Sequence, residues 1–191
     1  ENTHPFIRQM WGKNWTYAHN GQLKGFKEAL AIKLHLPIGT TDSEHAFCWV
    51  LDQLHYQFGT EQPSAHVLFA FIASLASKID ALGVANLIIS DGEFLFAYCS
   101  NNLHWITRRA PFGKASLIDA EMAVDFHQET TDKDVVTVIA TKPLTDDETW
   151  HQMSAGQWHL FCLGESIACG SETVLKDNTV YDTKRNDNDA V

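Results

Sequence analysis

Apolar residues recur at helical spacing in three stretches of the first half of the chain. The shortest covers Leu23–Leu34 and ends before a Pro-Ile-Gly break. The next begins at Thr41, whose hydroxyl can cap a helix while Glu44, three residues later, completes a capping box. The last runs from Pro63 to Leu82, with proline in the first turn and glycine just past the end. The two longer stretches therefore predict amphipathic helices that cover a sheet.

Short β-rich runs dominate from Ala85 onward, and the earlier run Trp15–Ala18 has the same character. That run stops at Asn20-Gly21, a pair that favours a tight turn with positive φ, so we expect the strand to end there. Asp91-Gly92 and Asn101-Asn102 predict hairpin turns between later strands. Strands grouped apart from helices indicate an α+β protein with antiparallel sheets. The later runs are Asn86–Ser90, Phe94–Ser100, Leu103–Arg108, Met122–Phe126, Val135–Ala140 and Trp158–Leu163.

The length and composition fit one globular domain. The chain has 191 residues, of which 45% are hydrophobic and 20% charged, which is enough to bury a real core. Aliphatic residues become sparse after Gly170, where Ser, Asp, Asn, Lys and Arg take over. We therefore expect one domain over residues 1–170 and a mobile polar tail over residues 171–191.

The charge balance narrows the choice of partners. With 24 acidic and 14 basic residues, the net charge is −10, which repels nucleic acid and anionic membranes. No apolar stretch is long enough to cross a bilayer, and the first residues lack the layout of a signal peptide. We expect a cytoplasmic protein that binds neither nucleic acid nor membrane.

The Asn20-Gly21 pair and Asp42 each allow a structural and a chemical interpretation. At a turn, the Asn20 carboxamide and the Gly21 N–H can point side by side, which suits the oxyanion of an acyl-transfer intermediate. Because Asn-Gly hairpins are common, spacing alone favours a plain turn. An acidic residue in the first helical turn is favoured by the helix dipole, yet the Asp42 carboxylate can also hold a substrate ammonium group.

Three motifs occur in an order that resembles the class II glutamine amidotransferases. They are Asn2-Thr3-His4-Pro5-Phe6, Trp15-Thr16-Tyr17-Ala18-His19-Asn20-Gly21 and Thr41-Asp42-Ser43-Glu44. The resemblance is closest to the small, stand-alone bacterial members and extends to about Gly164. It implies an α+β N-terminal-nucleophile hydrolase fold with four layers, αββα, in which antiparallel sheets lie between helical layers and the N-terminal part is missing.

The resemblance also implies a role for each motif. Asn20 and Gly21 would form the oxyanion hole, and Asp42 would bind the α-amino group of glutamine. His4 and His19 would be supporting residues near the pocket. The implied substrate is glutamine or a γ-glutamyl amide, with no cofactor and no metal. The implied partner is a second copy of the chain or a separate synthase, and plain hydrolysis is the alternative to ammonia transfer.

The nucleophile expected from this resemblance is an N-terminal Cys, whose α-amine serves as base. The chain begins with Glu1, so we expect that Cys upstream, together with an Arg that clamps the substrate α-carboxylate. No C-x-x-C pair occurs, and the four cysteines are expected to be small buried hydrophobes rather than nucleophiles or disulfides. They are Cys48, Cys99, Cys162 and Cys169.

Two other classes of function stay open from the sequence. In one, the chain is a non-catalytic binding or structural module that keeps a glutamine pocket and acts through oligomerisation. In the other, it is a metal-dependent hydrolase, an idea suggested by its 10 histidines. The second is the weaker, because H-x-H, H-E-x-x-H and C-x-x-C spacings are all lacking.

Overall fold

The computed structural model describes residues 2–110, 114–116, 123–125, 131 and 133–171. Of the predicted polar tail, Ser171 belongs to a strand and residues 172–191 lie outside the described part. The elements in chain order are β1 (Phe6–Met10), β2 (Lys13–Leu23), α1 (Phe26–Ala29), α2 (Asp42–Phe58), α3 (Ala65–Asp80), β3 (Gly83–Ser90), β4 (Phe94–Tyr98), β5 (His104–Arg109), β6 (Lys114–Ser116), β7 (Ala123–Asp125), β8 (Val135–Ala140), β9 (His151–Gln152), β10 (Gln157–Cys162) and β11 (Glu165–Ser171).

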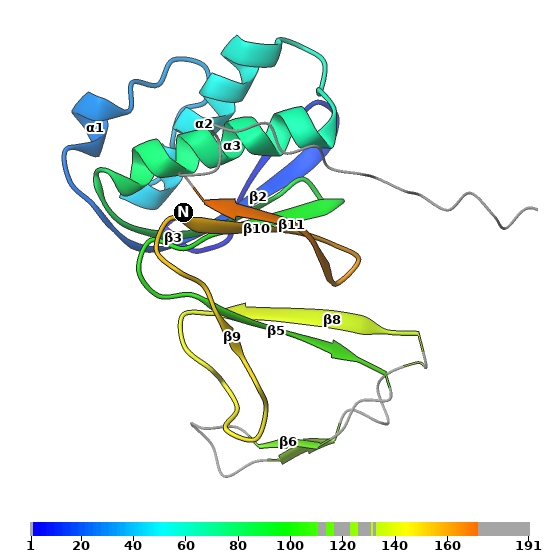
Figure 1. The fold of residues 1–191 in the computed structure, drawn as a ribbon. Helices are drawn as coiled ribbons and strands as arrows, with labels where there is room; N and C mark the ends of the chain where they lie inside the picture. Colours follow the sequence, from blue (N-terminus) through cyan, green and yellow to red (C-terminus); the bar gives the residue numbers. More distant parts are fainter. Residues whose placement is uncertain (1, 111–113, 117–122, 126–130, 132, 172–191) are drawn as a thin grey trace, which may run out of the picture.

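The centre of the molecule is a six-stranded sheet in the order β1-β2-β3-β4-β10-β11, with every neighbouring pair antiparallel. Helices α2 and α3 lie across one face of this sheet (Figure 1). A three-stranded sheet, β8-β5-β9, lies on the opposite side, and the β6–β7 hairpin lies beyond it (Figure 1). The antiparallel α+β class is thus confirmed. The described residues form a helical layer and two sheet layers, and the predicted fourth layer stays a prediction.

Alternation along the strands of the large sheet divides the core into two parts. One set of side chains packs under the helices, and it includes Trp15, Tyr17, Leu87, Phe96 and Leu160. The alternate positions face the small sheet, where Ala97, Cys99 and Phe161 meet Leu103 and Met153. The centre of the large sheet, at β3, β4 and β10, is therefore buried on both faces.

Both long helices form, with corrected ends. The Thr41 Oγ1 accepts a hydrogen bond from the Glu44 N–H at 3.1 Å, so the predicted cap is present. The second helix covers Ala65–Asp80 instead of 63–82, because Ser64 is its N-cap and Gly83 already begins β3. The predicted Leu23–Leu34 helix is wrong: only Phe26–Ala29 is helical, since Leu23 is held in the sheet.

Two turn predictions are also wrong, and a third is right except for the length of the turn. Asn20 and Gly21 lie inside β2, where they pair with Asn86 and Ala85 of β3, because β3 is long enough to keep the strand extended. The predicted Asp91-Gly92 hairpin joins β3 to β4, but the connection has three residues, whereas an Asp-Gly pair is typical of a two-residue turn. Asn101-Asn102 connects strands of different sheets, since β4 pairs with β3 and β10 whereas β5 pairs with β8 and β9. The ends of the predicted Met122–Phe126 strand lie outside the described residues, and β7 is its centre.

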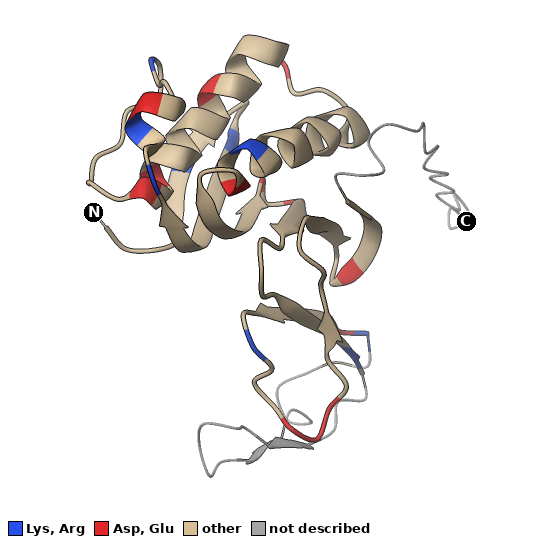
Figure 2. Cartoon of the chain, turned by 60° about the vertical axis from the view of Figure 1, so that its left-hand side comes forward, with Lys and Arg blue, Asp and Glu red and all other residues tan. Residues whose placement is uncertain are grey.

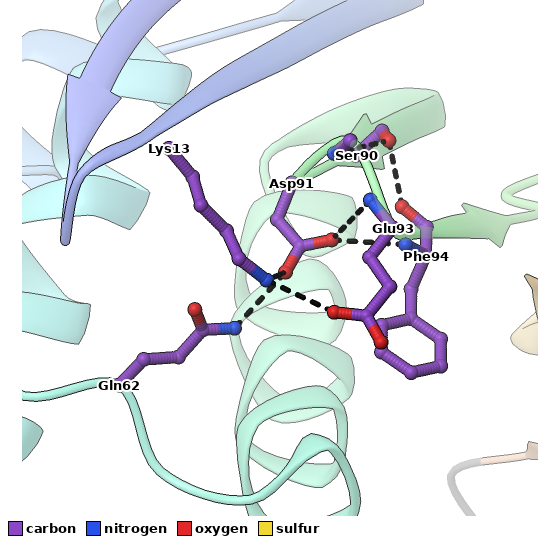
Figure 3. A network of polar contacts seen from close by, with 7 residues as sticks. Lys13, Gln62, Ser90, Asp91, Glu93 and Phe94 are labelled. Atoms are coloured by element: carbon purple, nitrogen blue, oxygen red, sulfur yellow. Dashed lines mark hydrogen bonds and ion pairs between the residues drawn. The ribbon is translucent and has the colours of Figure 1, made fainter.

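The β3–β4 connection is tied to two distant parts of the chain by the buried carboxylate of Asp91 (Figure 3). Its Oδ2 accepts hydrogen bonds from Lys13 Nζ at 2.8 Å and Gln62 Nε2 at 2.9 Å. Its Oδ1 accepts from the N–H groups of Glu93 at 3.1 Å and Phe94 at 2.9 Å. Both carboxylate oxygens are satisfied, so this network stabilises the end of the sheet.

The four cysteines are free thiols. Cys48 and Cys99 are buried as predicted, and burial raises the pKa of both thiols, which opposes formation of a thiolate. Cys162 is half-buried and Cys169 is exposed, because β11 is an edge strand of the sheet. The prediction of a small buried hydrophobe was therefore wrong for Cys169.

The positions of Lys, Arg, Asp and Glu are distributed over helices, strands and loops of the described chain (Figure 2). None of the helices in the described part of the chain is long and apolar enough to cross a membrane.

Candidate functional site

The end of β2 and the start of α2 meet at Asp42. The Asp42 Oδ2 accepts a hydrogen bond from the backbone N–H of Leu23 at 2.7 Å. Its Oδ1 accepts from the N–H of Ser43 at 2.8 Å, as an acidic residue in a first helical turn commonly does. The contact with Leu23 joins two of the three sequence motifs, because it places Asp42 beside the strand that contains Asn20 and Gly21.

A second link between β2 and α2 is made by His19. Its Nε2 lies 3.0 Å from the carbonyl oxygen of Val84, which can only accept, so the ring proton is on Nε2. The Nδ1 of His19 then accepts from the hydroxyl of Ser43, at 2.8 Å. Ser43 Oγ also lies 3.4 Å from Asp42 Oδ1, but its single proton is better used on the nearer nitrogen. His19 is buried and both ring nitrogens are satisfied, which makes it a structural link between strand and helix.

His4 lies near the same two residues. Partial burial lowers the pKa of its imidazole, the neighbouring His19 imidazole lowers it further, and the Asp42 carboxylate acts in the opposite direction. Its ring packs edge-on against Phe6, with centroids 4.7 Å apart. The structure thus brings His4, His19 and Asp42 together, and it holds His4 mainly as the neutral base at neutral pH.

The position of Gly21 requires a residue without a side chain. A Cβ there would collide with the backbone carbonyl of Val84 and would lie 2.9 Å from the Nε2 of His19. Gly21 has φ 158°, and it is exposed together with the preceding Asn20. Strand β2 therefore presents the Asn20-Gly21 segment at an accessible edge of the cluster formed by His4, His19 and Asp42.

The loop before α2 borders this cluster and is held by Glu44. This buried carboxylate accepts from the N–H groups of Ile38 at 3.0 Å and Gly39 at 2.6 Å and forms an ion pair with Arg8. Burial acts to raise the pKa of Glu44, but these hydrogen bonds and the Arg8 charge outweigh it and lower the pKa. The capping-box prediction was thus half right, because Thr41 caps the helix while Glu44 binds the loop.

Asn2 fixes the N-terminal segment to the same loop. Its Oδ1 accepts from the N–H of Thr40 at 3.0 Å, and its Nδ2 lies 3.3 Å from the Thr40 hydroxyl. The first motif therefore contacts the residue directly before the third motif, although 38 positions separate the two residues in the chain.

Sequence reasoning missed Asn86, a buried residue of β3 that lies opposite Asn20 in the sheet. Its side chain contacts the backbone of Asn20 and the loop after β4. The available signal was one carboxamide in the otherwise apolar run Asn86–Ser90, and a polar residue buried in such a run must have hydrogen-bond partners.

Tyr17 of β2 is a neighbour of Asp42 that is less exposed than Asn20 and Gly21. It is buried, stacks on Phe47 with ring centroids 5.2 Å apart, and has no hydrogen-bond partner for its hydroxyl among the described residues. Burial strongly raises the pKa of this phenol, and the negative charge of Asp42 raises it further. Tyr17 is therefore neutral at physiological pH.

Among the described residues, His, Cys, Asp and Glu side chains form no group of three or more that could hold a metal ion.

Comparison with known proteins gives consistent results. The family model of class-II glutamine amidotransferases matches residues 1–185. The Escherichia coli K12 protein named "Putative glutamine amidotransferase YafJ" is 54% identical over 167 residues, which cover 87% of this chain and 65% of that protein. The Haemophilus influenzae protein named "Putative glutamine amidotransferase" is 44% identical over 168 residues, covering 88% and 56%.

A solved structure agrees with these sequences. The 2.0 Å crystal structure of a "predicted glutamine amidotransferase" from Pseudomonas aeruginosa PA01 superposes with a TM-score of 0.79 at 50% identity, covering 87% of this chain and 65% of that one. The chain thus spans less than two thirds of the length of each of these three relatives.

Proposed function

Because this chain belongs to the class-II glutamine amidotransferases, we propose that the whole protein cleaves the side-chain amide of glutamine or of a related γ-glutamyl compound. The nucleophile is a cysteine upstream of Glu1, and the reaction proceeds through a γ-glutamyl acyl-enzyme. The observation that carries the proposal is the hydrogen bond between Asp42 and Leu23, which holds the start of α2 beside the Asn20-Gly21 segment.

In this proposal Asn20 and Gly21 stabilise the tetrahedral intermediate. When sulfur attacks the amide carbon, the carbonyl oxygen gains negative charge, which the Asn20 carboxamide and the Gly21 N–H offset. The exposure of both residues supports this role, because a substrate carbonyl can approach the backbone there.

Asp42 binds the α-ammonium group of the substrate. A carboxylate has about four lone-pair positions, and Asp42 uses one on Oδ2 for the Leu23 N–H and one on Oδ1 for the Ser43 N–H. A lone pair on Oδ2 therefore stays available for a charged donor. His4 and His19 support the site by fixing the surrounding segments.

A reactive glutamine analogue tests the proposal on the full-length protein with its processed N-terminus. A diazoketone analogue should add once per chain, on the N-terminal cysteine, and excess glutamine should protect that residue. Exposed Cys169 and buried Cys48 are internal controls, because alkylation at Cys169 reports non-specific reaction and Cys48 should stay unmodified. Labelling confined to internal cysteines, with a free N-terminal cysteine present, would refute the proposed reaction.

The fate of the ammonia defines the remaining alternatives. The protein either releases it in plain hydrolysis or passes it to a separate synthase. Glutamate release that is independent of any added protein, measured on the purified full-length protein, would support hydrolysis. A rate that rises by an order of magnitude with a second purified protein would support transfer.

A further inference from the structure

Asn86 is a buried carboxamide at the centre of the large sheet. It lies in β3 between Ala85 and Leu87, whose side chains belong to the core under the helices. Because successive strand residues point to opposite faces, the Asn86 side chain leaves this core and faces the other side of the sheet. Only 4% of Asn86 is exposed, so its polar atoms require partners within the protein.

The side chain of Asn86 is fully hydrogen-bonded. Its Oδ1 accepts from the backbone N–H groups of Ser100 at 3.1 Å, Asn101 at 3.2 Å and Asn102 at 3.2 Å. Its Nδ2 donates to the Asn101 Oδ1 at 2.8 Å and to the backbone carbonyl of Asn20 at 3.3 Å. Since only oxygen can accept from three N–H groups, the orientation of the carboxamide is fixed, and Nδ2 must face Asn20.

The contact with the Asn20 carbonyl acts on the peptide group that joins Asn20 to Gly21. This group is planar, so a donor that fixes its C=O also fixes the direction of the Gly21 N–H. A hydrogen bond to the oxygen also polarises the peptide and makes its N–H a stronger donor. From this geometry we infer that Asn86 is a positioning residue for the oxyanion hole, an inference that rests on the proposed function.

The same side chain attaches the oxyanion segment to a second part of the molecule. The loop at residues 100–102 leads from the large sheet to the small one, and Asn86 holds its three N–H groups and the Asn101 side chain. Asn86 thus fixes the Asn20–Gly21 peptide relative to a rigid support, which is what preorganised charge stabilisation requires.

Asn86→Asp separates this role from the support of the loop. Aspartate keeps an oxygen for the three loop N–H groups but has no proton to donate to the Asn20 carbonyl or to Asn101 Oδ1. The exposed carboxamide of Asn101 can turn and donate to the new carboxylate, whereas the Asn20 carbonyl can only accept and loses its donor. In glutamine hydrolysis by the full-length protein, kcat should fall roughly 10-fold or more while KM changes less than about threefold, because the loss is confined to the transition state. Asn102→Ala is the matched control: it keeps the backbone N–H and removes only an exposed side chain, so kcat should stay within about twofold.

The γ-aldehyde analogue of glutamine gives a second readout. The cysteine thiol adds across its C=O bond, sulfur to carbon and proton to oxygen, and forms a tetrahedral adduct whose oxygen occupies the oxyanion hole. In Asn86→Asp, inhibition by this aldehyde should weaken by about the same factor as kcat, whereas binding of the product glutamate should not change. If that variant does not fold, Asn86→Ser replaces it. Serine removes the contacts with the loop together with the contact to Asn20, so kcat and inhibition by the aldehyde should fall together while binding of glutamate stays unchanged.

Three results would overturn the inference. One is an unchanged kcat in either folded variant, and another is a parallel loss of kcat, KM and glutamate binding, which would indicate a general structural role. The third is a wild-type protein that neither hydrolyses glutamine nor binds the aldehyde. That result would refute the proposed function itself, and the assay of the wild-type protein reveals it before any variant is measured.

Discussion

Asp52 provides a direct test of how the loop before α2 is held. Its carboxylate is buried in α2 and binds the loop through four donors. The Oδ2 accepts from the N–H groups of Lys33 at 2.5 Å and Leu34 at 3.1 Å. The Oδ1 accepts from the N–H of His35 at 2.9 Å and from its ring Nδ1 at 2.8 Å. The perturbation is Asp52→Asn, which keeps the shape and replaces one oxygen by an NH₂ group.

The size of the effect follows from counting donors. With the NH₂ group at the Oδ2 position, the N–H groups of Lys33 and Leu34 lose their acceptor. With it at the Oδ1 position, the His35 N–H loses its acceptor, while the neutral His35 ring can change tautomer and accept at Nδ1. One or two unsatisfied donors, at about 1–3 kcal/mol each, give roughly 1–6 kcal/mol. A loss near 3 kcal/mol lowers the Tm of a protein of this size by about 6–12 °C.

Thermal unfolding of the full-length protein measures this loss. The matched control is Asp80→Asn, since Asp80 accepts only from the Tyr98 hydroxyl among its described hydrogen bonds, at 3.1 Å, and asparagine can still accept there. We expect the control to change the free energy of unfolding by less than about 1 kcal/mol. A Tm of Asp52→Asn within about 2 °C of wild type would refute the reasoning.

The pH dependence gives a second test of the same carboxylate. Burial acts to raise the pKa of Asp52, but hydrogen bonds from the backbone and from His35 outweigh it and lower the pKa below its ordinary value of 3.8. A depressed pKa contributes stability that is fully present above the ordinary value and is lost as pH falls through the depressed one. The difference in Tm between wild type and Asp52→Asn should therefore shrink in acid.

Three further predictions concern the site and the core. Gly21→Ala should abolish glutaminase activity and lower the Tm, because its Cβ meets the backbone carbonyl of Val84; an active alanine variant would contradict the close approach. Asp42→Asn should raise KM for glutamine about 10-fold or more with less effect on kcat, through loss of a charge-assisted hydrogen bond, and an unchanged KM would exclude ammonium binding there. Burial, reinforced by the charge of His151, lowers the pKa of His159 in the folded protein. As the pH falls below about 6.5, His159 is therefore protonated in the unfolded chain before it is protonated in the folded one, and the wild-type protein should lose stability. Thermal unfolding measured against pH should show a smaller loss of stability in His159→Gln.

Local sequence signals predicted the start of helix α2 correctly and the end of strand β2 wrongly. Thr41 predicted the helix start, because a cap is an interaction between neighbours in sequence. Asn20-Gly21 predicted a turn that does not exist, because pairing with β3 keeps β2 extended beyond that pair. The functional interpretation of Asn20 and Gly21 therefore cannot depend on a hairpin, and it now rests on an exposed strand segment.

The sequence motifs named residues of the candidate site, but they did not predict how these residues are arranged in space. Sequence named His4, His19, Asn20, Gly21 and Asp42, and the structure places the two histidines and Asp42 together. Asn86 and the Ser43–His19 contact could not be predicted, since each joins residues separated by tens of positions. Such contacts depend on strand order, which local patterns do not specify.

The sequence by itself determined the two long helices, the antiparallel α+β class and the family, because these follow from periodicity, capping and short contiguous motifs. Only the tertiary structure decided that the centre of the large sheet is buried on both faces and that β2 continues through Asn20 and Gly21. It alone decided that Asn86 lies behind their peptide. The physical reason is that a buried polar atom takes its partner from whichever strand the fold brings beside it.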